Sequence, residues 1–438
     1  MRFMKKILVS VLFVLIFVFS GCGGGNTTED KKVVLILSKN SVALVEGASA
    51  QVTATVYVEN VLEESPAIVW SSKNPEIATV ENGLLTALSE GETTILAKYG
   101  KKVATVDVFI AKALTADEVN SFDEQYVNIY GRHYITDGQL NFDHAANAVE
   151  VGVVGSTLSV NVASTANSYM QVFVDDEKTG KTVALYAGSR KYTVAQNLSN
   201  GYHKIRLVKA TEEQNAVWDI LFFEADGFAS IPEKSALKIE FVGDSITAGY
   251  AVLGLPGGAW TLANSSATST YAYYTAQALN ADYSVVAYSG ICTKAYLWVA
   301  DLNMETLYKR YSRTNAQEYA FDEDTDVVVL NLGTNDMSYI LSNPTYASSF
   351  PADYESLLRY IRAQNPNAHI ICLYGMMGNN SFIHEGITTA VQNINDKKIV
   401  YNPFAITADA LGAAGHPSAT AQKGWGDLLT AYIQSLGL

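Results

Sequence analysis

The sequence predicts an α/β domain with a parallel sheet, preceded by two all-β sandwich domains. Short, nearly continuous apolar runs at 237–242, 326–332 and 369–374 alternate with helical patterns from residue 237 onward. Such strands are typical of parallel sheets that helices cover on both faces. Upstream, short runs of alternating apolar and polar residues indicate sandwiches. At 438 residues, 48% hydrophobic and 17% charged, the chain is long enough for several globular domains.

The N-terminal segment 1–21 has a basic start and an apolar run at 7–19, which predicts a secretory signal. A membrane-spanning anchor is the alternative. Residues 19–22, Phe-Ser-Gly-Cys, resemble a bacterial lipobox, although this motif usually has an aliphatic residue at the position of Phe19. The resemblance implies a lipoprotein with a lipidated Cys22, exported and anchored at the bacterial cell surface or outer membrane. Residues 22–32 are then a polar, flexible tether.

Residues 33–112 form the first predicted sandwich. Alternating runs at 50–58 and 102–110 are separated by turn residues. The segment 69–95, which includes Trp70, resembles a bacterial immunoglobulin-like domain of group 2. We interpret Trp70 as a core residue, and we expect the domain to have a spacer or weak adhesion role.

A junction at 112–120 leads to the second predicted sandwich, residues 121–230. Strand-like runs at 148–162, 169–175 and 203–209 suggest a jelly roll. Glycan-binding modules share this architecture. We expect a structural domain that packs on the next domain and shapes its cleft, and glycan binding is the alternative.

The third domain, residues 236–438, carries candidate chemistry at the ends of its strands. The run 241–247 passes from an apolar strand into Gly, Asp and Ser245. A serine hydroxyl needs a base to accept its proton and donors for the oxyanion that forms on the attacked carbonyl. Gly290 and Asn335 end two further predicted strands, and His416 lies near the C-terminus. In parallel sheets, sites gather at the carboxyl ends of the strands.

These four blocks, in this order, resemble the SGNH (GDSL-type) hydrolase superfamily. The resemblance implies that Ser245 is the nucleophile and His416 the base. It also implies an oxyanion hole made of the Ser245 and Gly290 backbone N–H groups and the Asn335 side-chain amide. Asp244 is interpreted as a brace for the turn.

The sequence departs from this superfamily three residues before His416, where its usual aspartate is replaced by Ala413. Asp409 is one alternative partner for the imidazole, but residues 411–415 look like a flexible link. A backbone carbonyl is the other alternative. We therefore predict a Ser–His dyad.

A closer resemblance covers residues 121–438. Gly131-Arg132, 241–250, 278–290 and 307–310 are similar to blocks of carbohydrate esterase family 2. This resemblance implies an acetyl xylan esterase-like enzyme that removes acetyl groups from polysaccharide or oligosaccharide, such as xylan or glucomannan. It also implies an acetyl-enzyme intermediate and no metal or cofactor. The alternatives are another SGNH esterase, lysophospholipase or thioesterase, and a cell-surface glycan-binding protein with an inactive hydrolase domain.

Tryptophans near the catalytic blocks are candidates for stacking on sugar rings. Trp260 and Trp298 are the main candidates, and Trp425 is a weaker one. The Gly- and Ser-rich stretch 254–270 is expected to form a rim or lid.

The formal net charge of −14 argues against nucleic acid or anionic membrane surfaces as partners, so the lipid anchor is the expected membrane contact. We expect a monomer. Cys292 and Cys372 are predicted to be two buried thiols, although export permits a disulfide. The six histidines show no metal-ligand spacing.

Overall fold

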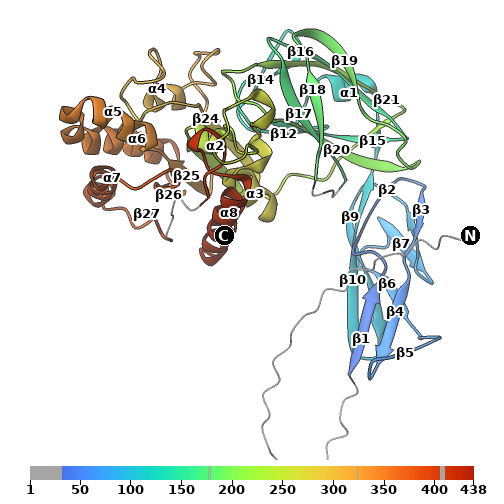
Figure 1. Cartoon of the computed structure of the whole chain (residues 1–438). Coiled ribbons are helices and arrows are strands. Elements are labelled where there is room, and N and C mark those ends of the chain that lie inside the picture. Colours follow the sequence, from blue (N-terminus) through green and yellow to red (C-terminus); the bar gives the residue numbers. More distant parts are fainter. Residues whose placement is uncertain (1–31, 176, 178, 323, 405–409) are drawn as a thin grey trace, which may run out of the picture.

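A computed structural model describes residues 32–438 except 176, 178, 323 and 405–409. The chain forms three consecutive domains, with the N-terminal one in blue at one end and the C-terminal one in orange and red at the other (Figure 1). The predicted signal, Cys22, most of the tether and Asp409 lie outside the described residues. Within the described ranges, no helix has the length and apolar composition needed to cross a membrane.

The first domain is the expected immunoglobulin-like sandwich. Trp70 is half-buried and packs against its core. Its strands, in the order of each sheet, are β1 (Val33–Leu37), β4 (Ala54–Val58) and β5 (Val61–Leu62); β2 (Ser41–Val45), β10 (Lys102–Ala111), β9 (Gly91–Tyr99) and β6 (Val69–Ser72); and β3 (Ser49–Gln51), β8 (Leu84–Ala87) and β7 (Ala78–Glu81).

The second domain is the expected β-sandwich. One sheet has the order β11 (Ala113–Leu114), β22 (Phe228–Ala229), β15 (Ala148–Val154), β20 (Tyr202–Lys209), β17 (Ser168–Val174) and β18 (Lys181–Leu185), with β12 (Asn128–Tyr130) also pairing with β15. The other has the order β13 (Tyr134–Thr136), β14 (Gln139–Phe142), β21 (Trp218–Ala225), β16 (Leu158–Ser164) and β19 (Gly188–Ala195).

The predicted junction at 112–120 is part of this sandwich. Its residues form β11, which pairs with β22, and helix α1 (Ala116–Asn120). The side-chain oxygen of Asn120 accepts a hydrogen bond of 2.7 Å from the backbone N–H of Phe223. The sheet of the second domain therefore begins within the predicted junction, and a two-residue strand is too short to give a sequence pattern.

The third domain has the predicted parallel sheet. Its strand order is β24 (Asp282–Ala287), β23 (Lys238–Gly243), β25 (Val327–Asn331), β26 (His369–Leu373) and β27 (Ile399–Tyr401). Its helices are α2 (Ser245–Ala248), α3 (Tyr271–Ala278), α4 (Met304–Tyr308), α5 (Thr334–Ser342), α6 (Phe350–Gln364), α7 (Ser381–Ile394) and α8 (Ala419–Ser435), with single 3-10 turns η1 (Leu262–Asn264), η2 (Ala267–Ser269), η3 (Pro344–Ser348) and η4 (Ala413–Gly415).

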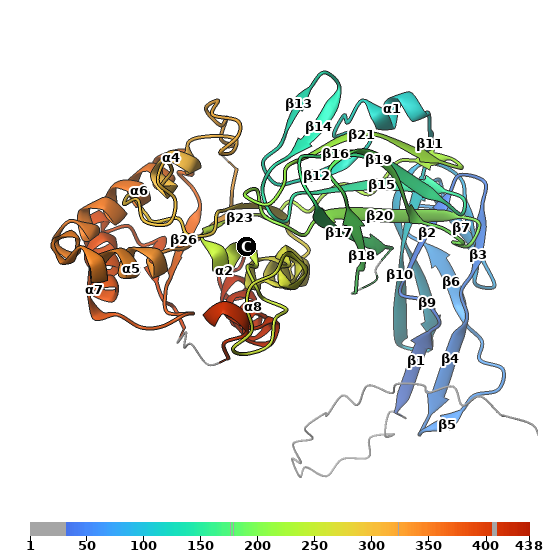
Figure 2. The ribbon, with the colours of Figure 1, turned by 45° about the horizontal axis from the view of Figure 1, so that its top comes forward.

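The two faces of this sheet explain its apolar strands. Phe241 packs into the core beneath α3 and α8, whereas its neighbour Val242 packs into the core beneath α6 and α7. Because successive strand side chains point to opposite faces, both faces require apolar residues. Figure 2 shows α8 on one side of the sheet and α6 and α7 on the other.

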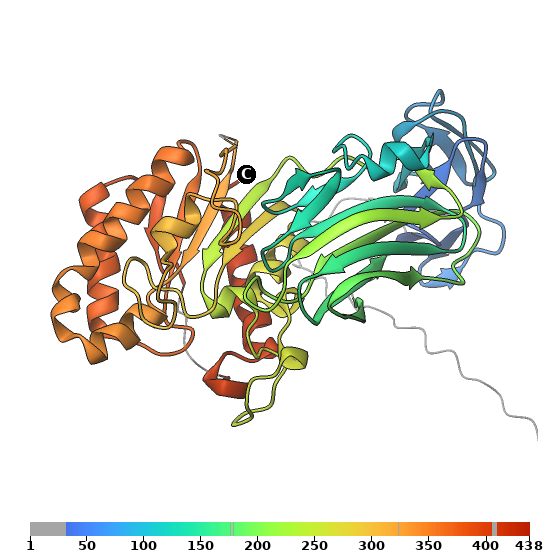
Figure 3. The same cartoon turned by 90° about the horizontal axis from the view of Figure 1, so that it is seen from above.

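A buried arginine joins the second domain to the third. Arg132 donates to the Glu240 carboxylate at 3.0 Å and to the carbonyls of Tyr308 and Arg310 at 2.6 and 2.8 Å. Its guanidinium also lies 4.0 Å from the ring centroid of Tyr319. Two of the sequence blocks that resemble carbohydrate esterases, 131–132 and 307–310, therefore meet at this interface, and Figure 3 shows the two domains side by side.

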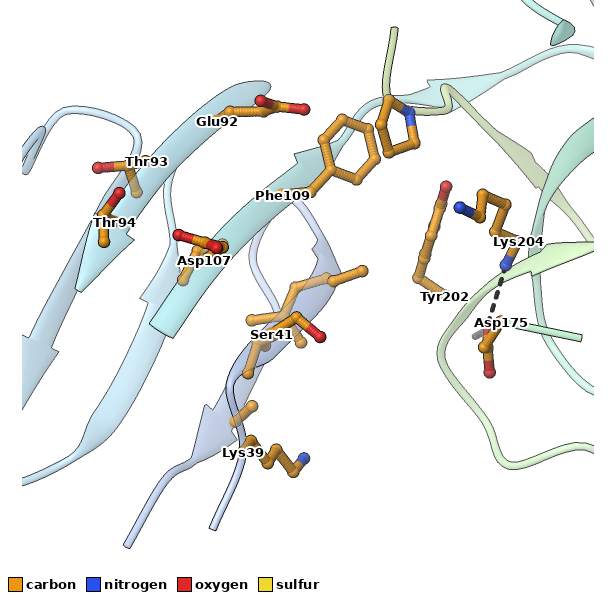
Figure 4. A pocket seen from close by; sticks show the side chains of 16 residues that line it. Lys39, Ser41, Glu92, Thr93, Thr94, Asp107, Phe109, Asp175, Tyr202 and Lys204 are labelled. Atoms are coloured by element: carbon orange, nitrogen blue, oxygen red, sulfur yellow. Dashed lines mark hydrogen bonds between the residues drawn. The ribbon is translucent and has the colours of Figure 1, made fainter. Parts of the chain in front are cut away.

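The first domain contacts the second beside an open groove of about 700 Å³ (Figure 4). Phe109 of β10 meets Tyr202 of β20 edge-on, with ring centroids 5.7 Å apart. Asp107 and Lys204 line the same groove. None of the predicted catalytic residues lines it.

Cys292 and Cys372 are both buried and free. The prediction of two thiols, without a disulfide between them, is confirmed.

Candidate active site

Ser245 is presented by a sharp turn at the carboxyl end of the central strand β23. A Cβ on Gly243 would lie 2.1 Å from the Thr247 hydroxyl oxygen, so the turn has no room for a side chain there. The Asp244 carboxylate caps helix α2 by accepting from the N–H of Ile246 at 3.0 Å. Asp244 therefore braces the turn, and Ser245 begins the helix.

His416 lies within hydrogen-bond distance of Ser245. Its Nε2 is 2.8 Å from the Ser245 Oγ, and its Nδ1 is 3.0 Å from the carbonyl oxygen of Ala414. A carbonyl can only accept, so Nδ1 carries the hydrogen and Nε2 presents its lone pair to the serine hydroxyl. Burial lowers the pKa of His416, which favours the neutral imidazole that can accept a proton, while the bond to Ala414 opposes that shift.

The segment before His416 is held in place by several backbone bonds. The Gly412 N–H donates to the His416 carbonyl at 2.6 Å, and the Ala414 N–H donates to the Gly258 carbonyl at 2.7 Å. Ala414 adopts a left-handed conformation with φ of 51°. The expectation of a flexible link at 411–415 was wrong, because these contacts run to residues whose proximity the sequence does not reveal.

Ala413 occupies the position of the superfamily's aspartate and offers no acceptor. It is fully buried, and its Cβ lies against Gly254, since a Cβ on that glycine would come within 2.2 Å of it. The Ala414 carbonyl is the acceptor for the imidazole within the described part of the chain.

Donors for an oxyanion meet beside Ser245. The backbone N–H groups of Ser245 and Gly290 donate to no partner within the described residues. Gly290 has φ of 82°, and a Cβ there would lie 2.8 Å from the Cβ of Trp298. The Asn335 amide donates to the Ile291 carbonyl at 2.9 Å, and its only other hydrogen bond among the described residues is a long one of 3.4 Å to the Asp244 carboxylate.

Two buried carboxyl groups support these donors. Burial raises the pKa of Asp244 to about 7 and that of Asp336 to about 6. Asp336, which follows Asn335, accepts from the backbone N–H and hydroxyl of Thr293 at 3.1 Å and from the Tyr346 hydroxyl. It thereby ties helix α5 to the segment that follows Gly290.

The serine and histidine open into a cavity of about 570 Å³. Its lining is Gln214, Ser245, Tyr250, Tyr288, Ser289, Gly290, Trp298, Val299, Ala300, Asp301, Arg313, Asn335, Ala414 and His416. All four predicted catalytic residues are among them.

Of the three tryptophans predicted to stack on sugar rings, only Trp298 lines the cavity. It is 71% exposed. Trp260 instead stacks on Tyr250 with ring centroids 5.5 Å apart, and Tyr250 in turn lies 4.6 Å from the His416 ring. Trp425 is 6% exposed in the core under α8, so it is not available to a sugar.

The β-sandwich packs on the third domain and helps to line its cavity, as expected from the sequence, but the individual residues involved were missed. Gln214, from the loop between β20 and β21, lines the cavity, and Glu212 accepts from Ser289. Arg313 forms an ion pair with Asp301 at 2.9 Å across the cavity wall. These loop residues follow no periodic pattern, so the sequence carried no signal for them.

Three regions of the chain match known families. Residues 241–423 match the GDSL-like lipase/acylhydrolase family, residues 129–234 the carbohydrate esterase 2 N-terminal family, and residues 34–109 the bacterial Ig-like domain, group 2. The predicted domain types and their order are confirmed.

Curated relatives and solved structures agree with these matches. The cellulase/esterase CelE of Acetivibrio thermocellus is 29% identical over 66% of this chain, but the match spans only 36% of that protein. An acetylxylan esterase / glucomannan deacetylase of Cellvibrio japonicus is 26% identical over 65% of this chain and 82% of its own length. A family two carbohydrate esterase from Clostridium thermocellum, solved with cellohexaose, aligns with a TM-score of 0.65 and 27% identity over 71% of this chain and 99% of its own.

Proposed function

We propose that this chain, which contains a GDSL-like acylhydrolase domain preceded by a carbohydrate esterase 2 N-terminal domain and an Ig-like domain, is a serine esterase that removes acetyl groups from carbohydrate. The observation that carries the proposal is the pair of Ser245 and His416, whose Oγ and Nε2 lie 2.8 Å apart in an open cavity, beside two backbone N–H groups that have no partner among the described residues. A base, a nucleophile and an oxyanion site in this arrangement constitute the machinery of acyl transfer.

The reaction begins when the Nε2 of His416 takes the hydroxyl proton of Ser245 and Oγ bonds to the acetyl carbonyl carbon. The N–H groups of Ser245 and Gly290 and the second amide hydrogen of Asn335 hold the oxyanion. His416 then protonates the sugar oxygen as its bond to the acetyl carbon breaks. Water, deprotonated by His416, attacks the acetyl-enzyme, releasing acetate and restoring Ser245.

The lining of the cavity favours a short acyl group on a neutral sugar. Among its described lining residues, Val299, Ala300 and Ala414 are the only aliphatic ones, so a long acyl chain would find few aliphatic side chains to contact. The charges of Arg313 and Asp301 neutralise each other. The exposed face of Trp298 offers a stacking surface at the rim. The activities of the Cellvibrio japonicus relative, acetylxylan esterase and glucomannan deacetylase, agree with this substrate class.

Acetate release from acetylated xylan, acetylated glucomannan and an aryl acetate tests the proposal. The protein from residue 27, which keeps every described residue, is compared with Ser245→Ala and His416→Ala. His384→Ala is the matched control, because that histidine bonds Tyr401 and Asn379 rather than the cavity. We expect both catalytic variants to lose at least about 10³-fold in rate and the control to lose less than twofold.

Each outcome of this assay has a distinct meaning. Cleavage of the aryl ester alone would retain the chemistry and reject the polysaccharide substrates. Absence of any hydrolysis by the wild-type protein would reject the esterase and favour a glycan-binding role.

We also propose that the protein is exported and held at the cell surface by a lipid on Cys22, on the basis of residues 1–22. Metabolic labelling with an alkyne fatty acid should label the wild-type protein and leave Cys22→Ser unlabelled. Equal labelling of both proteins would refute this anchor.

A further inference from the structure

The loop between β20 and β21 brings the β-sandwich into contact with the active site. Its first residue, Ala210, accepts a hydrogen bond of 2.8 Å from the backbone N–H of Ala267 in the third domain. Glu212 follows and is 2% exposed, while Gln214 reaches the cavity. A carboxylate from one domain is therefore buried next to the catalytic centre of another.

Glu212 binds the residue that precedes the oxyanion glycine. Its two carboxylate oxygens accept from the backbone N–H of Ser289 at 2.9 Å and from the Ser289 hydroxyl at 2.8 Å. The Gln214 amide donates to the same carboxylate at 2.9 Å. All three partners are donors, which suits an ionised carboxylate.

A buried cation balances this charge. Lys209 is fully buried, donates to the Thr211 carbonyl at 2.7 Å, and interacts electrostatically with Glu212, Glu213 and Asp143. Burial raises the pKa of Glu212, while the bonds from Ser289 and Gln214 and the charge of Lys209 lower it.

The fork on Ser289 constrains the peptide that carries the Gly290 N–H. A carboxylate that holds both the backbone nitrogen and the hydroxyl of Ser289 fixes its preceding peptide plane, its Cα and its χ1, and so anchors the point from which the peptide carrying the Gly290 N–H extends. Trp298 packs against Gly290, since a Cβ on that glycine would lie 2.8 Å from the Trp298 Cβ. Donors for an oxyanion are effective only when they are oriented before the reaction.

We propose that Glu212 is a positioning residue for the oxyanion hole, so that the β-sandwich completes the catalytic site of the third domain. This inference rests on the proposed function for its chemistry. It assigns the second domain a part in catalysis in addition to any sugar binding.

Glu213 provides a matched control in the same loop. It is also buried, at 5% exposure, and it also crosses the interface, where it accepts from the backbone N–H of Thr314 at 2.8 Å. It makes no bond to Ser289 or Gly290. A purely structural role at the interface would make the two glutamates equivalent.

The test compares Glu212→Ala, Glu212→Gln and Glu213→Ala for aryl acetate hydrolysis, with unfolding temperatures measured alongside. We expect Glu212→Ala to lower kcat about 10- to 100-fold and to change KM less than about threefold. One oxyanion donor contributes roughly 10²–10³-fold to the rate, and a misdirected donor loses much of that contribution. Glu212→Gln keeps an acceptor for the Ser289 N–H, so it should recover kcat to within about fivefold of wild type. Glu213→Ala should keep kcat within about threefold.

The rate of Ser245 labelling by an organophosphonate provides a second readout that requires no ester substrate, and Glu212→Ala should slow it by the same factor as kcat. A wild-type protein that is labelled but cleaves no acetyl ester would reject the proposed substrate, while the labelling rates would still test the role of Glu212. Unchanged kcat and labelling in a folded Glu212→Ala, or an equal loss in Glu213→Ala, would overturn the positioning role. A wild-type protein that is neither labelled nor active would overturn both proposals.

Discussion

The orientation of His416 by the carbonyl of Ala414 can be tested by changing the backbone at that position. Ala414 has φ of 51° and donates its N–H to Gly258. Proline fixes φ near −65° and has no N–H, so Ala414→Pro must move the carbonyl away from the Nδ1 of His416. Ala414→Gly is the matched control, because glycine adopts positive φ readily and retains the carbonyl.

The expected magnitude follows from the lost contacts. A neutral hydrogen bond such as that from Nδ1 contributes about 0.5–1.5 kcal/mol, which corresponds to roughly 2- to 13-fold in the population of the correct tautomer and rotamer. Displacement of the base by about 1 Å raises the total cost to as much as about 10²-fold. We therefore expect Ala414→Pro to lower kcat for an aryl acetate about 10- to 100-fold and Ala414→Gly to change it less than about twofold.

The pH dependence of the rate provides an independent test of Ala414→Pro, because the expected direction of the pKa shift of His416 is known. Activity requires the neutral imidazole, and burial lowers its pKa from 6.5, so the acid limb of the wild-type rate should lie below pH 6.5. The bond to Ala414 favours the imidazolium and raises this pKa. Its loss should lower the pKa further and move the acid limb to lower pH. Wild-type kcat in a folded Ala414→Pro, or an acid limb at higher pH, would refute this role of the carbonyl.

Three further predictions follow from contacts around the site. Arg132→Met leaves the Glu240 carboxylate buried without its cation, so the free energy of unfolding measured in urea should fall by about 3–5 kcal/mol. Lys191→Met, which breaks an exposed ion pair, should cost less than about 1 kcal/mol, and equal losses would contradict the argument. Gly290→Ala places a Cβ 2.8 Å from that of Trp298, so kcat should fall by at least about 10²-fold; a loss under threefold would show that the turn adapts. Trp298→Ala should raise KM for acetylated xylan about 2- to 13-fold but leave KM for an aryl acetate unchanged, and equal shifts would exclude stacking on sugar.

The parallel sheet could be predicted because burial of both its faces requires apolar residues along every strand. Val242 and Leu330 must be apolar like their neighbours, since both faces of the sheet are buried. The same topology places Ser245, Gly290 and Asn335 at one edge, where their strands end. Motifs that follow such strands therefore indicate a shared site before any coordinates are known.

Errors occurred where a segment depends on distant partners. Residues 113–114 were placed in a junction between domains but pair with β22, more than one hundred residues away. The loop before His416 looked flexible but is bonded to Gly258. Trp425 lies near a catalytic block in sequence, but helix α8 turns it into the core. Local composition cannot report these contacts, because each depends on a residue remote in the chain.

By itself, the sequence determined the order of the three domains, the parallel sheet and the residue types available for nucleophile, base and oxyanion donors. Only the tertiary structure decided that a carbonyl orients His416 and that Glu212 of the β-sandwich holds the turn before Gly290. Every residue has a carbonyl, and acidic residues in loops are common, so neither has a distinctive sequence pattern. Each gains its role from the folded backbone, which brings it within hydrogen-bond distance of a group far away in the chain.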